Sequence, residues 1–221
     1  MGVRCNTLAQ GTSPPRLSGM KLNLQPALVL VVAWMLACSG CAVPDGWPVH
    51  AGPRTVAASE WGGTPGPSGL PHQTVNEITI HHQGERWVAG SDVAAYLRRL
   101  QQWSRDTRGW ADIPYHYIIA PDGTIYAGRS PLIAGDTNTE YNPYGQIQVM
   151  LLGNFEEQTP TQEQWDSAVR MLAHLLTIHD LPASSIAAHR HRSTQTVCPG
   201  AHLMARFEKL RAAAAARAGR P

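Results

Sequence analysis

Cys198 has no evident disulfide partner in the sequence, so the fold of this chain must give a lone thiol a protected place. The three other cysteines, Cys5, Cys38 and Cys41, all lie in or before an N-terminal segment typical of an export signal. A free thiol in an exported protein needs a chemical reason, since oxidising compartments convert unprotected thiols to disulfides. His189 precedes Cys198 in one polar stretch. With a second imidazole, these residues would make a three-ligand zinc set that leaves a position open for water.

The second imidazole is expected from a distant part of the chain. The alternation of apolar residues over 75–82 predicts a strand that ends in His81 and His82. Thr79 shares the face of His81, so the His81 side chain points away from the neighbouring isoleucines. The His82 side chain faces the opposite side of the strand, where we expect it to pack in the interior or to support a metal ligand. The zinc hypothesis therefore requires a fold that brings the end of this strand to residues 189–198.

The other histidines and motifs offer few competing sites. His191 remains open as an alternative ligand to His189. Five of the ten histidines show no partner pattern and are expected to be surface or packing residues: His50, His72, His174, His179 and His202. The sequence has no His-Glu-x-x-His helix, Gly-x-Ser-x-Gly elbow, P-loop or paired-cysteine finger, which disfavours the classes of protein that use them.

The N-terminus predicts export and a lipid anchor. Residues 26–37 are uncharged and apolar, follow Lys21, and are too few for a spanning helix, which needs ~20 residues. Ser39-Gly40-Cys41 resembles the end of a bacterial lipobox, so we expect residues 1–41 to be an extension and signal peptide, with a lipid on Cys41. Simple cleavage and an uncleaved anchor are the alternatives. The predicted location is the cell envelope, on the periplasmic or outer side of a bacterial membrane.

Charge and length indicate one near-neutral domain. Removing the three basic residues of the first forty positions from the 18 in the chain leaves 15 against 16 acidic residues. No basic run remains, so nucleic acid is not an expected partner. The remaining length suits one core, which we expect to be monomeric. We place a Pro/Gly-rich tether at 42–53, the domain at 54–216 and a tail at 217–221.

Local patterns predict the remaining elements. The apolar stripe after Ser91 predicts a helix over 92–106 with Ser91 as its N-cap. Pro121-Asp122-Gly123 predicts a hairpin between strands at 115–120 and 124–127. The apolar run 147–152 predicts a buried central strand. A capping box at 159–162, with Pro160 at the first helical position, predicts a second helix, and a last helix is expected over 201–216. This order predicts an α/β fold with a mixed central sheet and helices on both faces.

Several segments resemble a known family. They are Ser59-Glu60-Trp61-Gly62, the strand ending at His81-His82, the block from Pro114 to Arg129, and the run Leu152-Gly153-Asn154-Phe155 with the strand before it. Together with the final Thr-x-Cys-Pro-Gly block, they resemble the peptidoglycan recognition proteins and the related type 2 N-acetylmuramoyl-L-alanine amidases, including phage amidase lysozymes. The resemblance runs from about Arg54 to about Leu210.

The resemblance implies a zinc amidase domain. It implies His81, His189 and Cys198 as ligands of Zn²⁺, and Tyr115 and Thr196 as catalytic neighbours of the metal. The implied reaction is hydrolysis of the amide bond between N-acetylmuramic acid and L-alanine of the stem peptide. Members of the family that lost catalysis typically lack one of the metal ligands, often the cysteine, whereas this chain keeps all of them. The alternative is a non-catalytic lipoprotein that binds muropeptides. Candidate substrate contacts are His82, Arg129 and Asn142.

The chain also departs from the family pattern. The interval from His189 to Cys198 is one residue longer than the commonest spacing, and His191 stands where aspartate is frequent. Gln83-Gly84 replaces the usual small hydroxyl residue after the strand. A histidine often found before the central strand is absent from Ala134-Gly135-Asp136. These departures affect the expected substrate contacts more than the metal.

Overall fold

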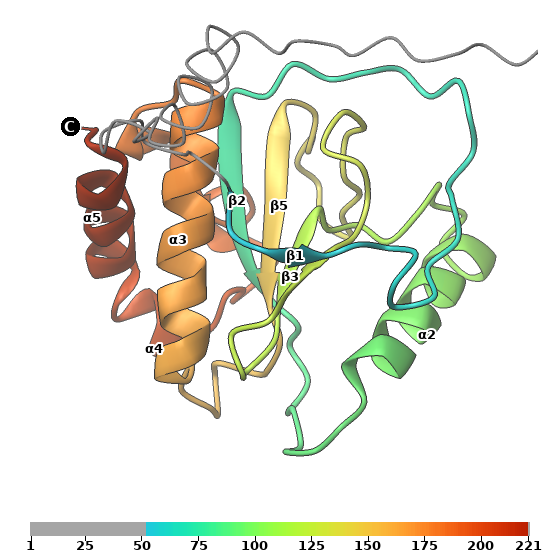
Figure 1. The fold of residues 1–221 in the computed structure, drawn as a ribbon, viewed down its shortest axis with the longest axis horizontal. Coiled ribbons are helices and arrows are strands. Elements are labelled where there is room, and N and C mark those ends of the chain that lie inside the picture. The colour runs from blue at the N-terminus through green and yellow to red at the C-terminus, as the bar shows by residue number, and fades with distance from the viewer. Residues whose placement is uncertain (1–51, 221) are drawn as a thin grey trace, which may run out of the picture. The chain divides into compact units, whose positions relative to one another are not determined.

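A six-stranded mixed sheet forms the centre of the computed structural model, which describes residues 52–220 (Figure 1). The strands lie in the order β1-β4-β3-β5-β2-β6, and only β3 and β4 are antiparallel. Their bounds are β1 Thr55–Val56, β2 Glu77–His82, β3 Tyr117–Ile119, β4 Ile125–Ala127, β5 Gln146–Leu151 and β6 Ile186–Ala188. The predicted signal peptide with Cys41, and almost all of the predicted tether, lie outside the described residues.

One face of the sheet is covered by two long helices, α3 Gln162–Ile178 and α5 Phe207–Ala218 (Figure 1). Alternate residues of β2 and β5 point into this layer, including Ile78, Ile80 and Val149, all fully buried. The short helix α4 Ala201–Met204 precedes α5. The apolar residues on this face of the strands pack against the apolar faces of the helices, and together they form the larger core of the domain.

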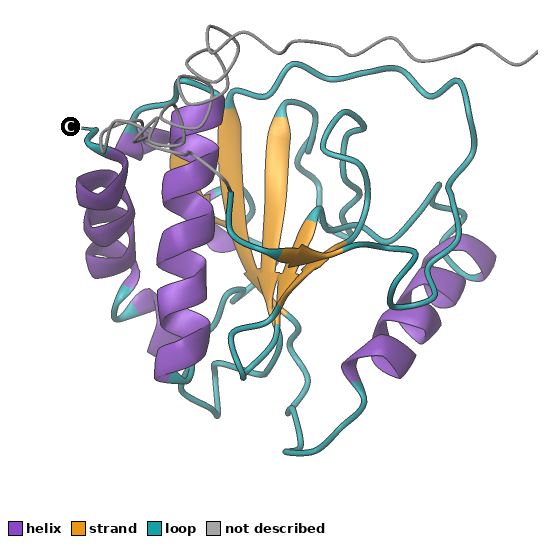
Figure 2. Ribbon diagram, in the orientation of Figure 1, coloured by secondary structure: helices purple, strands orange, loops and turns teal. Residues whose placement is uncertain are grey.

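The opposite face carries the helix α2 Val93–Asp106 over a smaller apolar cluster around Trp61, Leu97 and Met150. Part of this face is polar, because Thr79 and His81 of β2 lie beside glutamines of β5. Figure 2 shows the strands between α2 on one side and α3 with α5 on the other. The predicted mixed sheet with helices on both faces, in a single domain, is confirmed.

The predicted hairpin and central strand are confirmed, with shifted ends. β3 pairs antiparallel with β4 across a turn in which Gly123 has φ +81°, and β5 lies between β3 and β2. Thr55 and Val56 form β1, an edge strand that was not predicted. The three-residue strand β6 was also not predicted, because so short a run of Ile and Ala carries no usable periodicity.

Two predicted helix starts and the continuity of the last predicted helix were wrong. Asp92, not Ser91, caps α2, since its carboxylate accepts from the Ala95 N–H at 3.0 Å. Thr161 caps α3, so Pro160 precedes the helix rather than occupying its first turn. The last helix is broken after Met204 and resumes at Phe207.

Among the helices of residues 52–220, none combines the length and the apolar character needed to cross a membrane.

Candidate metal centre and cleft

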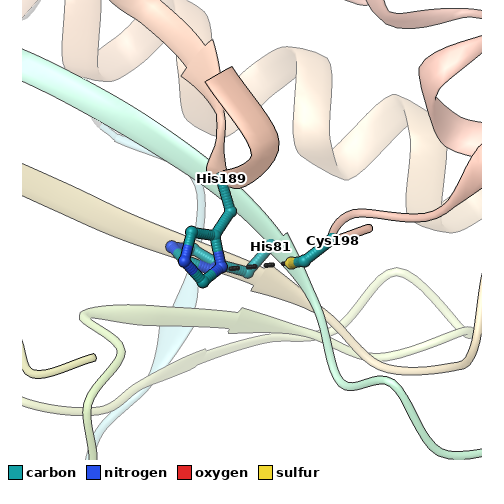
Figure 3. Close-up of side chains that lie close together, drawn as sticks. All are labelled: His81, His189 and Cys198. Carbon is teal, nitrogen blue, oxygen red and sulfur yellow. Dashed lines mark hydrogen bonds between the residues drawn. The ribbon is translucent and has the colours of Figure 1, made fainter. Parts of the chain in front are cut away.

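Three side chains from distant parts of the chain meet at one end of the sheet. His81 lies near the end of β2, His189 directly follows β6, and Cys198 lies in the loop before α4. Their candidate ligand atoms all lie within 4.8 Å of one another (Figure 3). β6 pairs with β2 so that Ala188 lies opposite Ile80. The residues that follow these two, His189 and His81, therefore lie close together. The structure therefore groups the three residues that the sequence singled out.

The contacts within this cluster are close. Cys198 Sγ lies 3.7 Å from His81 Nδ1, and the rings of His81 and His189 have centroids 4.6 Å apart. Cys198 Sγ also accepts the backbone N–H of His82 at 3.3 Å. All three side chains are buried, with exposed fractions of 9% or less. A backbone donor aimed at sulfur favours the thiolate form that binds metals.

Burial keeps the three groups uncharged in the absence of a cation. Desolvation, followed by the neighbouring His189, lowers the pKa of His81 to about 3. Desolvation, followed by His82, lowers the pKa of His189 to about 4. Desolvation raises the pKa of the Cys198 thiol to about 12, opposed by the His82 backbone N–H. Two neutral imidazoles and one thiol fit a zinc ion, whose charge would compensate the thiolate.

His191 does not belong to this cluster. Its Nδ1 accepts the Ala188 N–H at 3.2 Å, and its ring packs edge-to-face on Phe207 with centroids 5.2 Å apart. The short 3-10 turn His189–His191 directs the two imidazoles to different sides. Of the two alternatives left open by the sequence, the structure places His189 with His81 and Cys198.

Tyr115 and Thr196 flank the cluster in different ways. The Tyr115 ring lies 5.3 Å from the His81 ring, and burial followed by the nearby Cys198 raises its pKa well above the usual range. The phenol therefore stays protonated and can donate a hydrogen bond. Thr196 Oγ1 accepts the Cys198 N–H at 3.0 Å, so it supports the ligand loop while its own O–H remains available as a donor.

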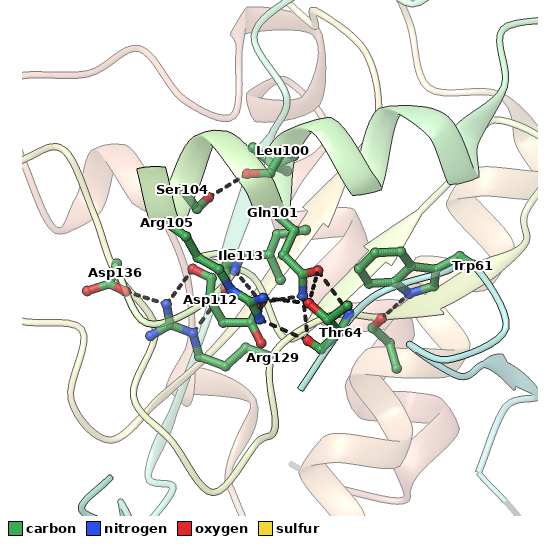
Figure 4. A network of polar contacts seen from close by, with 11 residues as sticks. Trp61, Thr64, Leu100, Gln101, Ser104, Arg105, Asp112, Ile113, Arg129 and Asp136 are labelled. Carbon is green, nitrogen blue, oxygen red and sulfur yellow. Dashed lines mark hydrogen bonds and ion pairs between the residues drawn. The ribbon is translucent and has the colours of Figure 1, made fainter. Parts of the chain in front are cut away.

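The three expected substrate contacts lie elsewhere. His82 Nδ1 accepts the Phe155 N–H at 3.1 Å, beneath the cluster. Arg129 is 5% exposed and donates to the backbone carbonyls of residues 112 and 113 and to the Asp136 carboxylate (Figure 4). It also donates to the carbonyl of residue 134. Asn142 Oδ1 accepts the Tyr144 N–H in a local turn. The structure gives these three side chains bonds within the fold and does not bring them into the cleft over the cluster.

The cleft itself opens beside His81 and His189 and has a volume of about 440 Å³. Its wall on α2 is formed by Tyr96, Arg99, Leu100 and Trp103, and Trp110 follows that helix. The remaining lining residues are Gln83, Glu85, Pro114, Tyr115, Asp136, Thr137 and Asn138. Trp103 is 40% exposed. Sequence reasoning found Tyr115 but missed the wall residues on α2, since a helical stripe does not reveal which of its side chains border a cavity.

Comparison with known proteins gives one consistent result. A family model described as N-acetylmuramoyl-L-alanine amidase matches residues 71–201. The chain is 29% identical over 178 residues to peptidoglycan-recognition protein SC1a of Drosophila melanogaster, covering 80% of this chain and 94% of that protein.

Solved structures agree with the sequence match. The fold is similar to that of Drosophila peptidoglycan recognition protein SD, with a TM-score of 0.63, 28% identity, and coverage of 71% of this chain and 94% of the other. It is also similar to N-acetylmuramoyl-L-alanine amidase LysC from Clostridium intestinale, with a TM-score of 0.59, 25% identity, and coverage of 72% and 96%. The chain therefore belongs to the family of type 2 N-acetylmuramoyl-L-alanine amidases and peptidoglycan recognition proteins.

Proposed function

We propose that this protein is a zinc-dependent N-acetylmuramoyl-L-alanine amidase, which hydrolyses the amide bond between N-acetylmuramic acid and L-alanine of the peptidoglycan stem peptide. The observation that carries the proposal is the grouping of His81, His189 and Cys198 within 4.8 Å of one another, beside a cleft that Tyr115 also lines. Three protein ligands drawn from imidazole and thiolate suit catalytic zinc, which keeps an open position for a reactant.

The chain's own residues supply the rest of the chemistry. Bound zinc would act as a Lewis acid that polarises a carbonyl and lowers the pKa of water. Tyr115, whose raised pKa keeps its phenol protonated, donates a hydrogen bond to the carbonyl oxygen of the scissile amide as that oxygen gains charge. Thr196, held by the Cys198 N–H, offers a second hydroxyl donor near the same bond. The cleft walls orient the substrate.

Relatives support peptidoglycan as the source of the substrate. The ectodomain complex of peptidoglycan recognition proteins LCa and LCx was solved with bound tracheal cytotoxin, and so was a mutant of Drosophila recognition protein LB. By similarity, the cleft of this protein takes a muropeptide. The aromatic side chains of Trp103 and Trp110 provide apolar surface for it, and Arg99 provides a cation for its carboxylates.

The alternative function is binding of muropeptides without hydrolysis. It is favoured by one observation, namely that proteins named recognition proteins are prominent among the similar chains. A complete ligand set favours the enzyme, because a pure binding module has no chemical need for a buried thiol beside two imidazoles.

The decisive experiment measures bound zinc by elemental analysis and release of stem peptide from purified sacculi on the same sample. The wild type should contain about one zinc per chain and release stem peptide. Chelation and Cys198→Ala should each reduce the release to background. A folded Cys198→Ala variant with full activity would overturn the proposal, and binding of muropeptides without release would favour the alternative.

The proposed location is the cell envelope, with a lipid on Cys41. The motivation is the Ser39-Gly40-Cys41 sequence after the apolar segment. Metabolic labelling of bacteria with a fatty-acid analogue should label the full chain, and Cys41→Ser should remove the label and release the domain from membranes. Equal labelling of both forms would contradict the anchor.

A further inference from the structure

The outer nitrogen of each candidate ligand imidazole is held by a side chain from the segment 139–148. His81 Nε2 contacts Gln148 Oε1, and His189 Nε2 contacts Thr139 Oγ1 at 2.8 Å. In both rings the nitrogen left for the cluster is therefore Nδ1, and that of His81 faces Cys198 Sγ. One continuous stretch of chain thus contacts both imidazoles, although the two lie more than 100 residues apart in the sequence.

We propose that Gln148 and Thr139 are positioning residues that present Nδ1 of His81 and of His189 to the metal. This inference rests on the proposed zinc function and concerns the residues of this chain that orient its ligands. A side chain that binds the far nitrogen of an imidazole sets which nitrogen carries the proton, orients the ring and raises the basicity of the ligand.

The surroundings of Gln148 support this role. Its side chain is 1% exposed, and its amide oxygen accepts from both His81 Nε2 and the Tyr141 hydroxyl, the latter at 3.3 Å. An amide oxygen can only accept, so the contact places the proton of His81 on Nε2. Its amide nitrogen, by contrast, is buried without a hydrogen-bond partner among the described residues. The hydrogen bonds of the Gln148 side chain are therefore made through its oxygen, which acts as an acceptor.

The backbone under Gln148 is also fixed. The Gln148 N–H donates to His116 Nδ1 at 2.8 Å, and the Gln148 carbonyl accepts the His116 N–H at 2.9 Å. His116 in turn contacts the Ile133 carbonyl through Nε2 at 2.9 Å. The acceptor that orients His81 is therefore attached to a rigid central strand rather than to a loop.

Thr139 holds His189 from a loop that borders the cleft. Its hydroxyl also contacts the Thr137 hydroxyl at 2.9 Å, and its N–H donates to the same oxygen at 3.2 Å. Thr137 and Asn138 line the cleft. The hydroxyl that orients His189 thus belongs to the residue directly after two that line the cleft.

The chain offers a matched control for Gln148. Gln146 lies two residues earlier on the same strand, on the same face, and is 5% exposed. Its oxygen accepts from the Thr79 hydroxyl at 2.6 Å instead of from a ligand. Gln148→Leu and Gln146→Leu each remove a buried amide from β5, but only the first removes a contact to an imidazole.

The test measures zinc affinity by competition with a chelator on the whole domain. Gln148→Leu should weaken zinc binding about 10- to 100-fold, whereas Gln146→Leu should leave it unchanged and Gln148→Glu should restore it. In the metal-free protein, ¹⁵N NMR of the imidazoles should find the His81 proton on Nε2 in the wild type and lose that preference in Gln148→Leu. Equal zinc affinities for the two leucine variants would overturn the inference.

Thr139 tests the same idea on the other imidazole. This residue is only partly buried, so its variants are expected to fold even if Gln148→Leu does not. Thr139→Val should weaken zinc binding, and Thr139→Ser, which keeps the hydroxyl, should not. If both bind zinc as the wild type does, the inference about His189 is wrong while the proposed hydrolase stands. If the wild type itself binds no zinc, the proposed function fails together with the inference.

Discussion

At the scale of single residues, the candidate centre is a set of groups that burial keeps neutral. His81 and His189 have pKa values of about 3 and about 4, lowered first by desolvation, and the pKa of Cys198 is raised by desolvation to about 12. At pH 7 the imidazoles are unprotonated and the thiol is protonated. The free ligand set therefore needs to lose only the thiol proton to bind a dication.

This state predicts the proton balance of metal binding. Uptake of zinc at pH 7 should release about one proton per chain, because only Cys198 must be deprotonated. Calorimetric titration in buffers with different enthalpies of ionisation measures the number directly. Release of more protons than Cys198 and a zinc-bound water together can supply would show that the imidazoles are protonated in the free protein.

Tyr115 is expected to act on the reaction rather than on the metal. Its ring lies beside His81, and its raised pKa keeps the phenol a donor. Tyr115→Phe should lower kcat about 100-fold or more, as loss of one donor to a developing oxyanion does, while the zinc content stays at the wild-type level. Steady-state assays and elemental analysis of one preparation check both. Unchanged kcat would remove Tyr115 from the mechanism.

At the scale of elements, the loop that carries Cys198 depends on Gly200. This glycine has φ +92°, and a Cβ there would come within 2.4 Å of the Phe155 backbone. Gly200→Ala should cost more than the ~1 kcal/mol of an ordinary left-handed site, because the clash adds to the strain and displaces the loop.

Gly219 provides the control for that change. It has φ +64° at the end of α5, and a Cβ added there would meet nothing within 4 Å. Gly219→Ala should cost only about 1 kcal/mol in denaturant unfolding and leave zinc binding intact. Equal losses at the two positions would show that the contact with Phe155 does not hold the Cys198 loop.

His116 links β3 to β5 and makes the stability of the fold depend on pH. Burial lowers its pKa to about 4, opposed by the Ile133 carbonyl, whereas the unfolded chain has the ordinary value of 6.5. The unfolded state therefore binds a proton first as the pH falls. The contribution of His116 to the free energy of unfolding is fully present above pH 6.5. It is lost progressively between about pH 6.5 and pH 4, by up to ~3 kcal/mol.

His116→Asn isolates that contribution. The asparagine oxygen can accept the Gln148 N–H in place of Nδ1, but the side chain does not titrate. Urea unfolding between pH 7 and pH 5 should show a shallower loss of stability in the variant than in the wild type, in metal-free protein. The other buried histidines remain in both proteins, so identical slopes would exclude His116 as a source of the pH dependence.

At the scale of the whole molecule, the centre joins segments that are far apart in the chain. His81, His189 and Cys198 connect β2, the end of β6 and the loop before α4, and the long helix α3 lies between the first two in the sequence. A ligand that binds only the folded arrangement stabilises all of these segments together. Metal binding and global stability are therefore coupled.

This coupling predicts a large effect of zinc on unfolding. Zinc at about 1,000 times its Kd should stabilise the domain by ~4 kcal/mol and raise the melting temperature by several degrees. A chelator should reverse the shift, and Cys198→Ala should abolish it. An equal shift in Cys198→Ala would mean that the stabilising ion binds at another site.

Features that depend on local pattern and on residue chemistry could be predicted from the amino-acid sequence. The alternation before His81 predicts its strand and its face, Pro121-Asp122-Gly123 predicts the hairpin, and the lone thiol of Cys198 predicts a metal ligand. These inferences need only the period of a strand, the geometry of a turn and the preferences of a cation.

Features that depend on the register between distant segments could be found only in the folded chain. Pairing of β6 with β2 brings His189 rather than His191 to His81, and burial of Arg129 among backbone carbonyls keeps it from the cleft. The contact of Gln148 with His81 likewise arises from the placement of β5 beside β2, and Thr139 contacts His189 from the loop before β5. No local pattern encodes such contacts, because they result from the packing of strands that lie far apart in the sequence.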